Sequence, residues 1–181
     1  MRWDALFADL EAQLDAEQTL QLGAEVAERT RVEWAGLTVI DRLRAQVGQP
    51  LTWSTTAGER VEGRLMEVGS DWVLLGVGRV EVLVPMAAVA SVSGLGPAAE
   101  QPGPAPLARR LPLSVVLRGL ARDRSVVTAQ LVGGERLIGT VDRVGADHLD
   151  LSLHPRDEPR RPSGLLDRRT VPMRALQQLS L

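Results

Sequence analysis

The stretch GERVEGRLMEVGSDWVLL, residues 58–75, returns as GERLIGTVDRVGADHLDL at residues 134–151. The correspondence extends over residues 37–75 and 113–151 at a constant offset of 76, with 13 of 39 positions identical. Copies that differ in side chains but keep their spacing indicate one structural unit used twice. The sequence therefore predicts two small folded units of the same kind.

A shorter matching block follows each copy. It reads VPMAA at residues 84–88 and VPMRA at residues 171–175, where the offset has grown to 87. The second copy therefore carries 11 additional residues between 76 and 170. They are expected to form a loop at residues 154–169, a charged segment with three prolines.

Apolar alternation between glycine turns predicts the strands of both copies. Those of the first copy are residues 51–55, 61–68, 72–75, 80–84 and 88–93. The second copy is predicted to form a helix at 113–122 and strands at 126–132, 136–144, 148–153 and 175–181. Short strands at this spacing are typical of a small closed barrel. The expected fold class is α+β, mainly β, with N-terminal helices followed by two tandem five-stranded barrels, each preceded by a helix.

The N-terminal region is predicted to form two helices, at residues 3–17 and 19–46. Apolar residues three and four positions apart give the first helix one apolar face. This candidate face for a partner helix consists of Trp3, Leu6, Phe7, Leu10 and Leu14. The expected boundaries are a helical segment at 1–36, a first repeat at 37–94, a Pro/Gly-rich linker at 95–110 and a second repeat at 111–181.

The pattern of the two copies resembles the Sm/Lsm family of SH3-like barrels. The first Sm motif corresponds to Gly63-Arg64-Leu65, Val68 and Leu74-Leu75, and in the second copy to Gly139-Thr140-Val141, Val144 and Leu151. The second motif corresponds to residues 84–92 and 171–179. The resemblance implies a helix followed by a bent five-stranded barrel. The layout is also similar to uncharacterised proteins of high-GC Gram-positive bacteria, some of them labelled Fis-type regulators.

The two positions that contact nucleotides in RNA-binding Sm proteins are an Asp and an Asn. This sequence holds Gly69 and Val73 there in the first copy, and Gly145 and Leu149 in the second. The resemblance therefore implies the fold of the family without its nucleotide pocket.

Composition excludes several kinds of chemistry. The chain has no Cys, which excludes disulfides and thiolate ligands. All 21 basic residues are Arg, so a P-loop lysine and Schiff-base catalysis are excluded as well. His148 and His154 flank Asp150 and are interpreted as solvent-facing rather than as metal ligands. No catalytic residue, cofactor or metal is expected, and a hydrolase that uses Asp147 and His148 is the weakest alternative.

Arginine is concentrated in the second half of the chain. Residues 1–106 hold 8 Arg and 15 acids, a net charge of −7, whereas residues 107–181 hold 13 Arg and 8 acids, a net charge of +5. Arg suits bidentate contact with phosphate. The candidate nucleic-acid or anion contacts are Arg156, Arg160, Arg161, Arg168, Arg169 and Arg174. Trp72 is interpreted as a barrel-core or helix-packing residue, and Trp53 as a candidate platform for base stacking.

These observations favour a non-enzymatic interaction or adaptor protein that self-associates or binds another protein. The alternative is an RNA- or DNA-binding regulator that uses the Arg-rich second barrel. No apolar run approaches the roughly 20 residues that cross a bilayer. The first residues lack the layout of a signal peptide, so a cytoplasmic location without membrane contact is the expectation.

Overall fold

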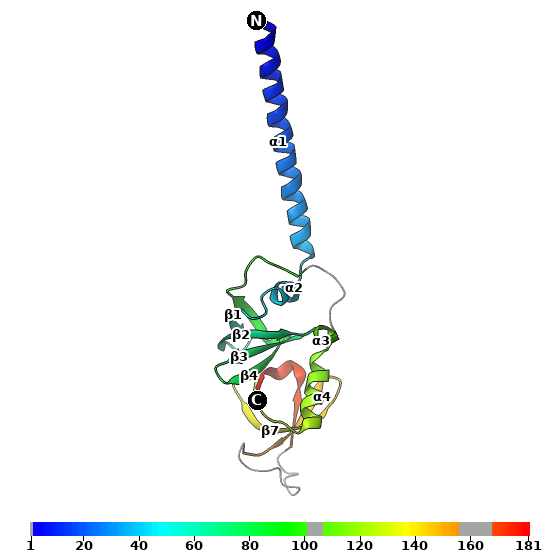
Figure 1. The fold of residues 1–181 in the computed structure, drawn as a ribbon. Helices are drawn as coiled ribbons and strands as arrows, with labels where there is room; N and C mark the ends of the chain where they lie inside the picture. The colour runs from blue at the N-terminus through cyan, green and yellow to red at the C-terminus, as the bar shows by residue number, and fades with distance from the viewer. Residues whose placement is uncertain (1, 101–106, 156–167) are drawn as a thin grey trace. The chain divides into compact units, whose positions relative to one another are not determined.

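The computed structural model describes residues 2–100, 107–155 and 168–181, without the side chains of 2–6, 8–17, 19–20 and 107–108. The chain divides into two compact units, Met1–Thr38 and Val39–Leu181. The first unit contains one helix, α1 (Arg2–Gly36), drawn in blue in Figure 1. Every described side chain of α1 is exposed. The prediction of two helices that join at residue 18 and end at residue 46 is therefore wrong. One helix continues to Gly36, and the break falls at residues 37–38.

The second unit begins with a short helix and five strands. These elements are α2 (Val39–Arg44), β1 (Pro50–Thr55), β2 (Arg60–Val68), β3 (Trp72–Val77), β4 (Val80–Pro85), the 3-10 turn η1 (Met86–Ala88) and β5 (Val89–Ser93). We call this part, together with the segment up to residue 100, the first half of the unit.

The second half repeats this order of elements. It contains α3 (Leu107–Arg110), α4 (Leu113–Asp123), β6 (Val126–Leu131), β7 (Arg136–Val144), β8 (His148–Leu153), β9 (Arg168–Pro172), the 3-10 turn η3 (Met173–Ala175) and β10 (Leu176–Ser180). β9 is not among the strands predicted from the sequence, because its first residues were assigned to the loop at 154–169.

All ten described strands form one antiparallel sheet in the order β5-β1-β2-β3-β4-β10-β6-β7-β8-β9. The protein is therefore α+β and mainly β, as predicted. The expectation of closed barrels is not met, because the sheet is open: within the described residues β5 pairs only with β1, and β9 only with β8. The free sides of both strands are the edges of the sheet.

Strand pairing is the same in the two halves. Pro50 pairs with Arg64 in the first half, and Val126 pairs with Thr140 in the second, each 76 residues further along. A bulge interrupts β2–β3 between Leu65 and Glu67, and its counterpart lies between Val141 and Arg143 on β7. A bulge increases the local bend and twist of a strand, so the two halves of the sheet bend at the same place.

Each half has its own apolar core. The core of the first half includes Leu43 of α2, Trp53 of β1 and Val73 and Leu75 of β3, all at 0 % exposure. The interpretation of Trp53 as a base-stacking platform is therefore wrong. The core of the second half is built from α4 and strands β6–β10, and it also takes in Trp72 and Leu83 from the first half. Because successive strand residues face opposite sides, β3 and β4 contribute to both cores.

The start of the predicted linker is packed against α2. The backbone N–H of Glu100 donates to the Asp41 carbonyl oxygen at 2.9 Å, and the Arg42 guanidinium donates to the Gly96 carbonyl oxygen at 3.0 Å. Arg109 of α3 forms an ion pair with Glu100. The described ends of the linker are therefore held to the two halves that they connect.

Candidate functional site

The joint between the two halves is a pair of antiparallel strands, β4 and β10. Leu83 pairs with Leu179 and Val82 with Ser180. The backbone N–H of Leu181 donates to the Glu81 carbonyl oxygen at 3.2 Å, which extends the ladder by one residue. The joint therefore turns two five-stranded sheets into one of ten strands.

Side-chain hydrogen bonds also connect the two halves, between the turn after β1 and residues of β6 and β10. Gln177 is 2 % exposed, and its Oε1 accepts from Thr56 Oγ1 at 3.0 Å and from the Ala57 N–H at 3.1 Å. Glu59 accepts a hydrogen bond from Gln130. Arg60, the neighbour of Glu59, forms an ion pair with Glu62 of its own strand at 3.3 Å. Glu59 is therefore the member of the Glu59-Arg60 pair that contacts the second half.

Asp71 and Trp72 connect β3 to the start of α4. Asp71 Oδ1 accepts from the backbone N–H of Leu113 at 2.7 Å, and Trp72 Nε1 donates to the Leu111 carbonyl oxygen at 2.9 Å. The first N–H groups of a helix have no partner within the helix, so the Asp71 carboxylate serves as a cap. The N–H that Asp71 binds belongs to a residue 42 positions further along the chain.

The two edge strands of the sheet, β9 and β5, are the repeat counterparts of the two joint strands, β4 and β10. At an offset of 87, the edge strand β9 is the counterpart of β4, and the joint strand β10 is the counterpart of the edge strand β5. In the joint, the outer side of β4 in the first half pairs with β10 of the second half. Within the described residues, the outer sides of β9 and β5 have no strand partner.

The joint also defines which edge groups point outward. Leu181 and Glu81 form a hydrogen-bonded pair, so Leu179 and Leu83, two residues along, form the next such pair. Their counterparts are Val92 on β5 and Thr170 on β9. The backbone N–H and C=O groups of Val92 and Thr170 are therefore those directed away from the sheet.

Three of the six candidate arginines lie in the described part of the chain: Arg168, Arg169 and Arg174, all exposed. Arg156, Arg160 and Arg161 lie outside it. Arg168 lines a pocket of about 370 Å³ together with Arg122, Arg124 and Arg143. Arg169 and Arg174 are not among the residues that line this pocket, so of the three described members of the predicted set only Arg168 reaches it.

The backbone explains how arginines from three elements converge there. Arg124 has a φ of 51°, the left-handed conformation that ends α4 at its C-terminus. Among the described residues that line the pocket, Asp142 is the only acid; it accepts from Ser152 Oγ at 2.5 Å and from Arg168 at 3.3 Å. The described wall therefore holds four guanidiniums and one carboxylate, an excess of positive charge. Arg122 and Arg124 were noted in the sequence as arginines that precede the Arg-rich stretch, whereas Arg143 was missed because it lies apart from both groups.

Asp147 and His148 form a contact on the surface of the second half. His148 Nδ1 lies 2.9 Å from Asp147 Oδ1, and the Asp147 side chain is 87 % exposed. The hydrogen bond with His148 lowers the pKa of Asp147, and the charge of Arg174 acts in the same direction. His154 instead bonds Thr140 Oγ1 at 2.8 Å. Across residues 2–100, 107–155 and 168–181, no three His, Asp or Glu side chains are grouped as metal ligands would be.

The candidate partner face of α1 lies largely outside the described side chains. Of its five residues only Phe7 is described, and it is 58 % exposed. Leu22, Val26 and Val32 further along the helix are also exposed. Among the helices of the described part, none has both the length and the apolar composition needed to cross a bilayer.

Comparison with protein-family models gives no match to this chain, and comparison with curated proteins gives none either.

Proposed function

We propose that the protein is a non-enzymatic interaction protein, built from two Sm-like five-stranded units joined in one open sheet, that associates with further copies of itself through its sheet edges. The equal pairing offsets, the shared bulge and the order 5-1-2-3-4 in each half support the interpretation as two copies of one unit. The resemblance of residues 63–75 and 139–151 to the first Sm motif supports the Sm-like assignment.

The observation that carries this proposal is the match between the internal joint and the two edges. β4 pairs with β10 inside the chain, and β9 and β5 are their counterparts without strand partners among the described residues. Pairing β9 of one copy with β5 of the next would repeat the internal joint. Such head-to-tail contacts close into rings or extend into filaments, depending on the rotation between copies.

The joint between copies would be more polar than the internal one. The outer face of the first half presents Trp72, Leu74 and Leu83 to α4. Their counterparts in the second half are His148, Asp150 and Thr170, and Thr170 Oγ1 donates to Asp150 at 2.7 Å. Less apolar surface would be buried between copies, so backbone pairing would carry more of the affinity.

The test is the molar mass of the full chain by light scattering after size-exclusion chromatography over a range of concentrations. The wild type is expected to exceed the monomer mass. Thr170→Pro removes the N–H that points outward while keeping the ladder to β8, so the variant should fold and run at lower mass. Thr170→Val is the matched control, since it loses the same hydroxyl but keeps the N–H.

A wild-type mass equal to that of the monomer at every concentration would remove the proposal. Equal masses for Thr170→Pro and Thr170→Val above the monomer would place the contact elsewhere than β9. Circular dichroism of each variant establishes that a change in mass does not come from unfolding.

Binding of RNA or DNA is the second candidate function, and the Arg-lined pocket favours it. Arg124 and Arg143 form no ion pair with the described residues, and guanidiniums suit phosphate oxygens. The double substitution Arg124→Glu and Arg143→Glu should abolish the mobility shift of a homopolymer RNA in low salt. Arg60→Glu, an exposed position in the first half, is the control. No shift with the wild type at micromolar protein would exclude this function.

A further inference from the structure

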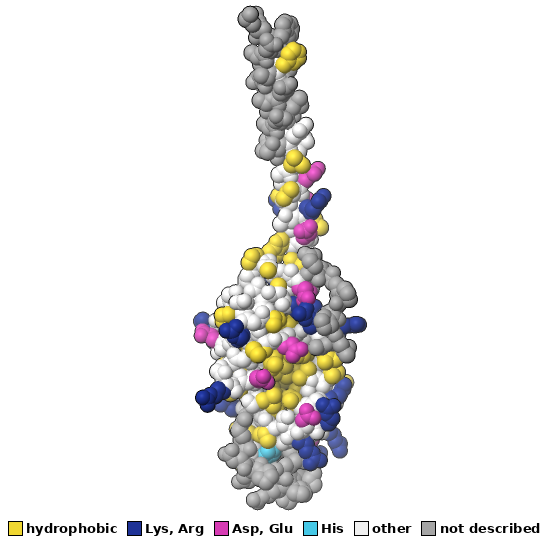
Figure 2. Space-filling view, viewed as in Figure 1, with side chains coloured by type: hydrophobic (Ala, Val, Ile, Leu, Met, Phe, Trp, Pro, Cys, Tyr) yellow, Lys and Arg dark blue, Asp and Glu magenta, His cyan; other side chains and the backbone are white. Residues whose placement is uncertain are grey.

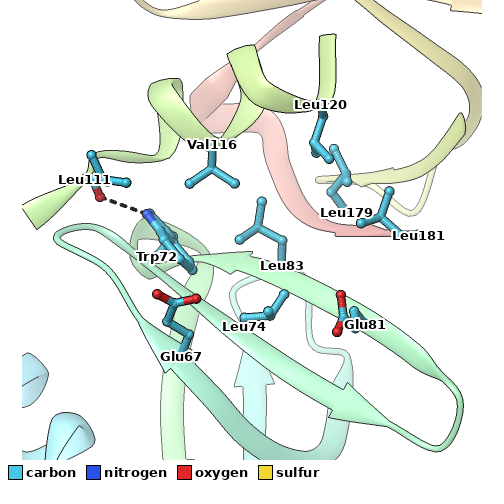
Figure 3. A pocket seen from close by; sticks show the side chains of 10 residues that line it. All are labelled: Glu67, Trp72, Leu74, Glu81, Leu83, Leu111, Val116, Leu120, Leu179 and Leu181. Atoms are coloured by element: carbon cyan, nitrogen blue, oxygen red, sulfur yellow. Dashed lines mark hydrogen bonds between the residues drawn. The ribbon is translucent and has the colours of Figure 1, made fainter. Parts of the chain in front are cut away.

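A pocket of about 280 Å³ lies between the outer face of the first half and the helix α4. Figure 3 shows Trp72, Leu74 and Leu83 of β3 and β4 on one side and Val116 and Leu120 of α4 on the other. Leu179 and Leu181 close one end. This volume is near the lower end of the range for small-molecule sites, so a small ligand fits it better than a protein segment.

The apolar wall of this pocket follows from how the two halves pack. On β3, Val73 and Leu75 point into the core of the first half. Trp72 and Leu74 alternate with them and therefore face the opposite side. Trp72 is nearly buried because Leu111 and α4 lie against it, whereas Leu74 is only partly covered. Hydrophobic side chains accordingly gather on this face of the second unit in Figure 2, with acidic side chains beside them. The wall suits a chain of methylene groups.

Two carboxylates stand at the two ends of this wall. Figure 3 shows Glu67 of β2 near Trp72, and Glu81 of β4 on the side of Leu181. None of the described residues that line the pocket is basic. Neither carboxylate forms an ion pair or a side-chain hydrogen bond with the described residues. The described wall of the pocket therefore holds two negative charges with no positive counterpart.

The strand registers set the spacing of these carboxylates. Glu67 pairs with Leu74, Leu74 pairs with Leu83, and Glu81 is two residues from Leu83 along β4. Two strand spacings and two residues of rise separate their Cα atoms by roughly 12 Å. An extended diamine of about six carbons spans such a gap once each ammonium reaches a flexible Glu side chain.

We propose that this pocket binds an alkyl diammonium ion, a diamine or short polyamine whose methylene chain lies on Leu74 and Leu83 and whose ammonium groups meet Glu67 and Glu81. The Trp72 ring adds a favourable surface for a cation near Glu67. Charge argues against the N-terminal helix of another copy as the occupant. Residues 1–18 carry one Arg and five acids, a net charge of −4, which the two carboxylates would repel.

This inference is independent of self-association, because the pocket is complete within one chain. The test is isothermal titration calorimetry of the full chain with hexamethylenediamine and with hexylamine, which has the same carbon chain and one ammonium. The diamine should bind about fivefold more tightly, since an exposed carboxylate–ammonium pair contributes up to about 1 kcal/mol. Glu67→Gln or Glu81→Gln should each remove that advantage.

Glu135→Gln is the matched control, because Glu135 is an exposed carboxylate in the turn between β6 and β7 and lines none of the described pockets. Its affinity for the diamine should equal that of the wild type. Absence of binding by the diamine at millimolar concentration would overturn the inference. So would equal affinity for the two amines, or an equal loss in Glu135→Gln, because either outcome indicates unspecific attraction of cations.

Discussion

Asp71 Oδ1 accepts a hydrogen bond from the backbone N–H of Leu113, 2.7 Å away and 42 residues further along the chain. A turn of the first half thus caps the helix that begins the second half. The residue that precedes α4 is Pro112, which provides no side-chain cap of its own. Asp71 therefore links the folding of one half to that of the other.

Replacing Asp71 by Ala should lower the free energy of unfolding by about 1 kcal/mol, because the Leu113 N–H at the start of α4 loses its acceptor. Asp71→Asn should retain most of the stability, since Asn is a comparable cap. Urea unfolding followed by circular dichroism measures both. The control is Asp147→Ala at the counterpart position, where the carboxylate is largely exposed and bonds only its neighbour His148 among the described residues. A loss in Asp147→Ala as large as in Asp71→Ala would contradict the capping role.

The two glycines of the central strands should differ in their tolerance of a methyl group. A Cβ at Gly139 would overlap the Ser152 carbonyl oxygen on β8, and backbone atoms cannot move aside without breaking the ladder. A Cβ at Gly63 would lie 3.0 Å from the Gly76 carbonyl oxygen and from a Val77 methyl group. We expect Gly139→Ala to cost about 3 kcal/mol and Gly63→Ala about 1 kcal/mol in thermal unfolding. Equal costs would show that β7 and β8 adjust more readily than their register suggests.

Gln177 should matter more for stability than its polar character suggests. It is 2 % exposed and accepts hydrogen bonds from Thr56 and from the Ala57 N–H, across the joint between the halves. Gln177→Ala would leave these donors without an acceptor, at a cost of about 1–3 kcal/mol. The neighbouring Gln178, whose Nε2 bonds Gln130 at 2.8 Å, provides the comparison. Gln178→Ala should cost less, because Gln178 is not a link to the first half in the described contacts.

Sequence reasoning located most strands because period-two patterns and glycine turns are local signals. The helix at 113–122 and the strands of the second copy were found within one or two residues, β9 excepted. The sheet itself was predicted incorrectly, because a period of two indicates which residues face inward but not which strand lies beyond an edge. The pairing of β4 with β10 depends on contacts about 100 residues apart, as between Leu83 and Leu179.

A signal for the joint was nevertheless present in the repeat. Where matched positions in the two copies differ between apolar and polar side chains, the difference indicates which copy is covered at that position. Trp72, Leu74 and Leu83 are apolar in the first copy, and His148, Asp150 and Thr170 replace them in the second. The first copy has a buried outer face and the second does not, as the burial of Trp72 and Leu83 confirms. The basic pocket gave no comparable signal, since its arginines come from α4, β7 and β9.

The contribution of the N-terminal helix to self-association can be separated from that of the sheet edges. If β9 and β5 carry the contact, a chain without residues 1–18 should keep the molar mass of its assembly, corrected for the deletion. Thr170→Pro in the same shortened chain should then lower the mass, because an edge strand without an outward N–H cannot complete a ladder. Light scattering on the four proteins, with and without each change, measures the two contributions independently. A monomer produced by the deletion alone would assign self-association to the apolar helix face around Phe7.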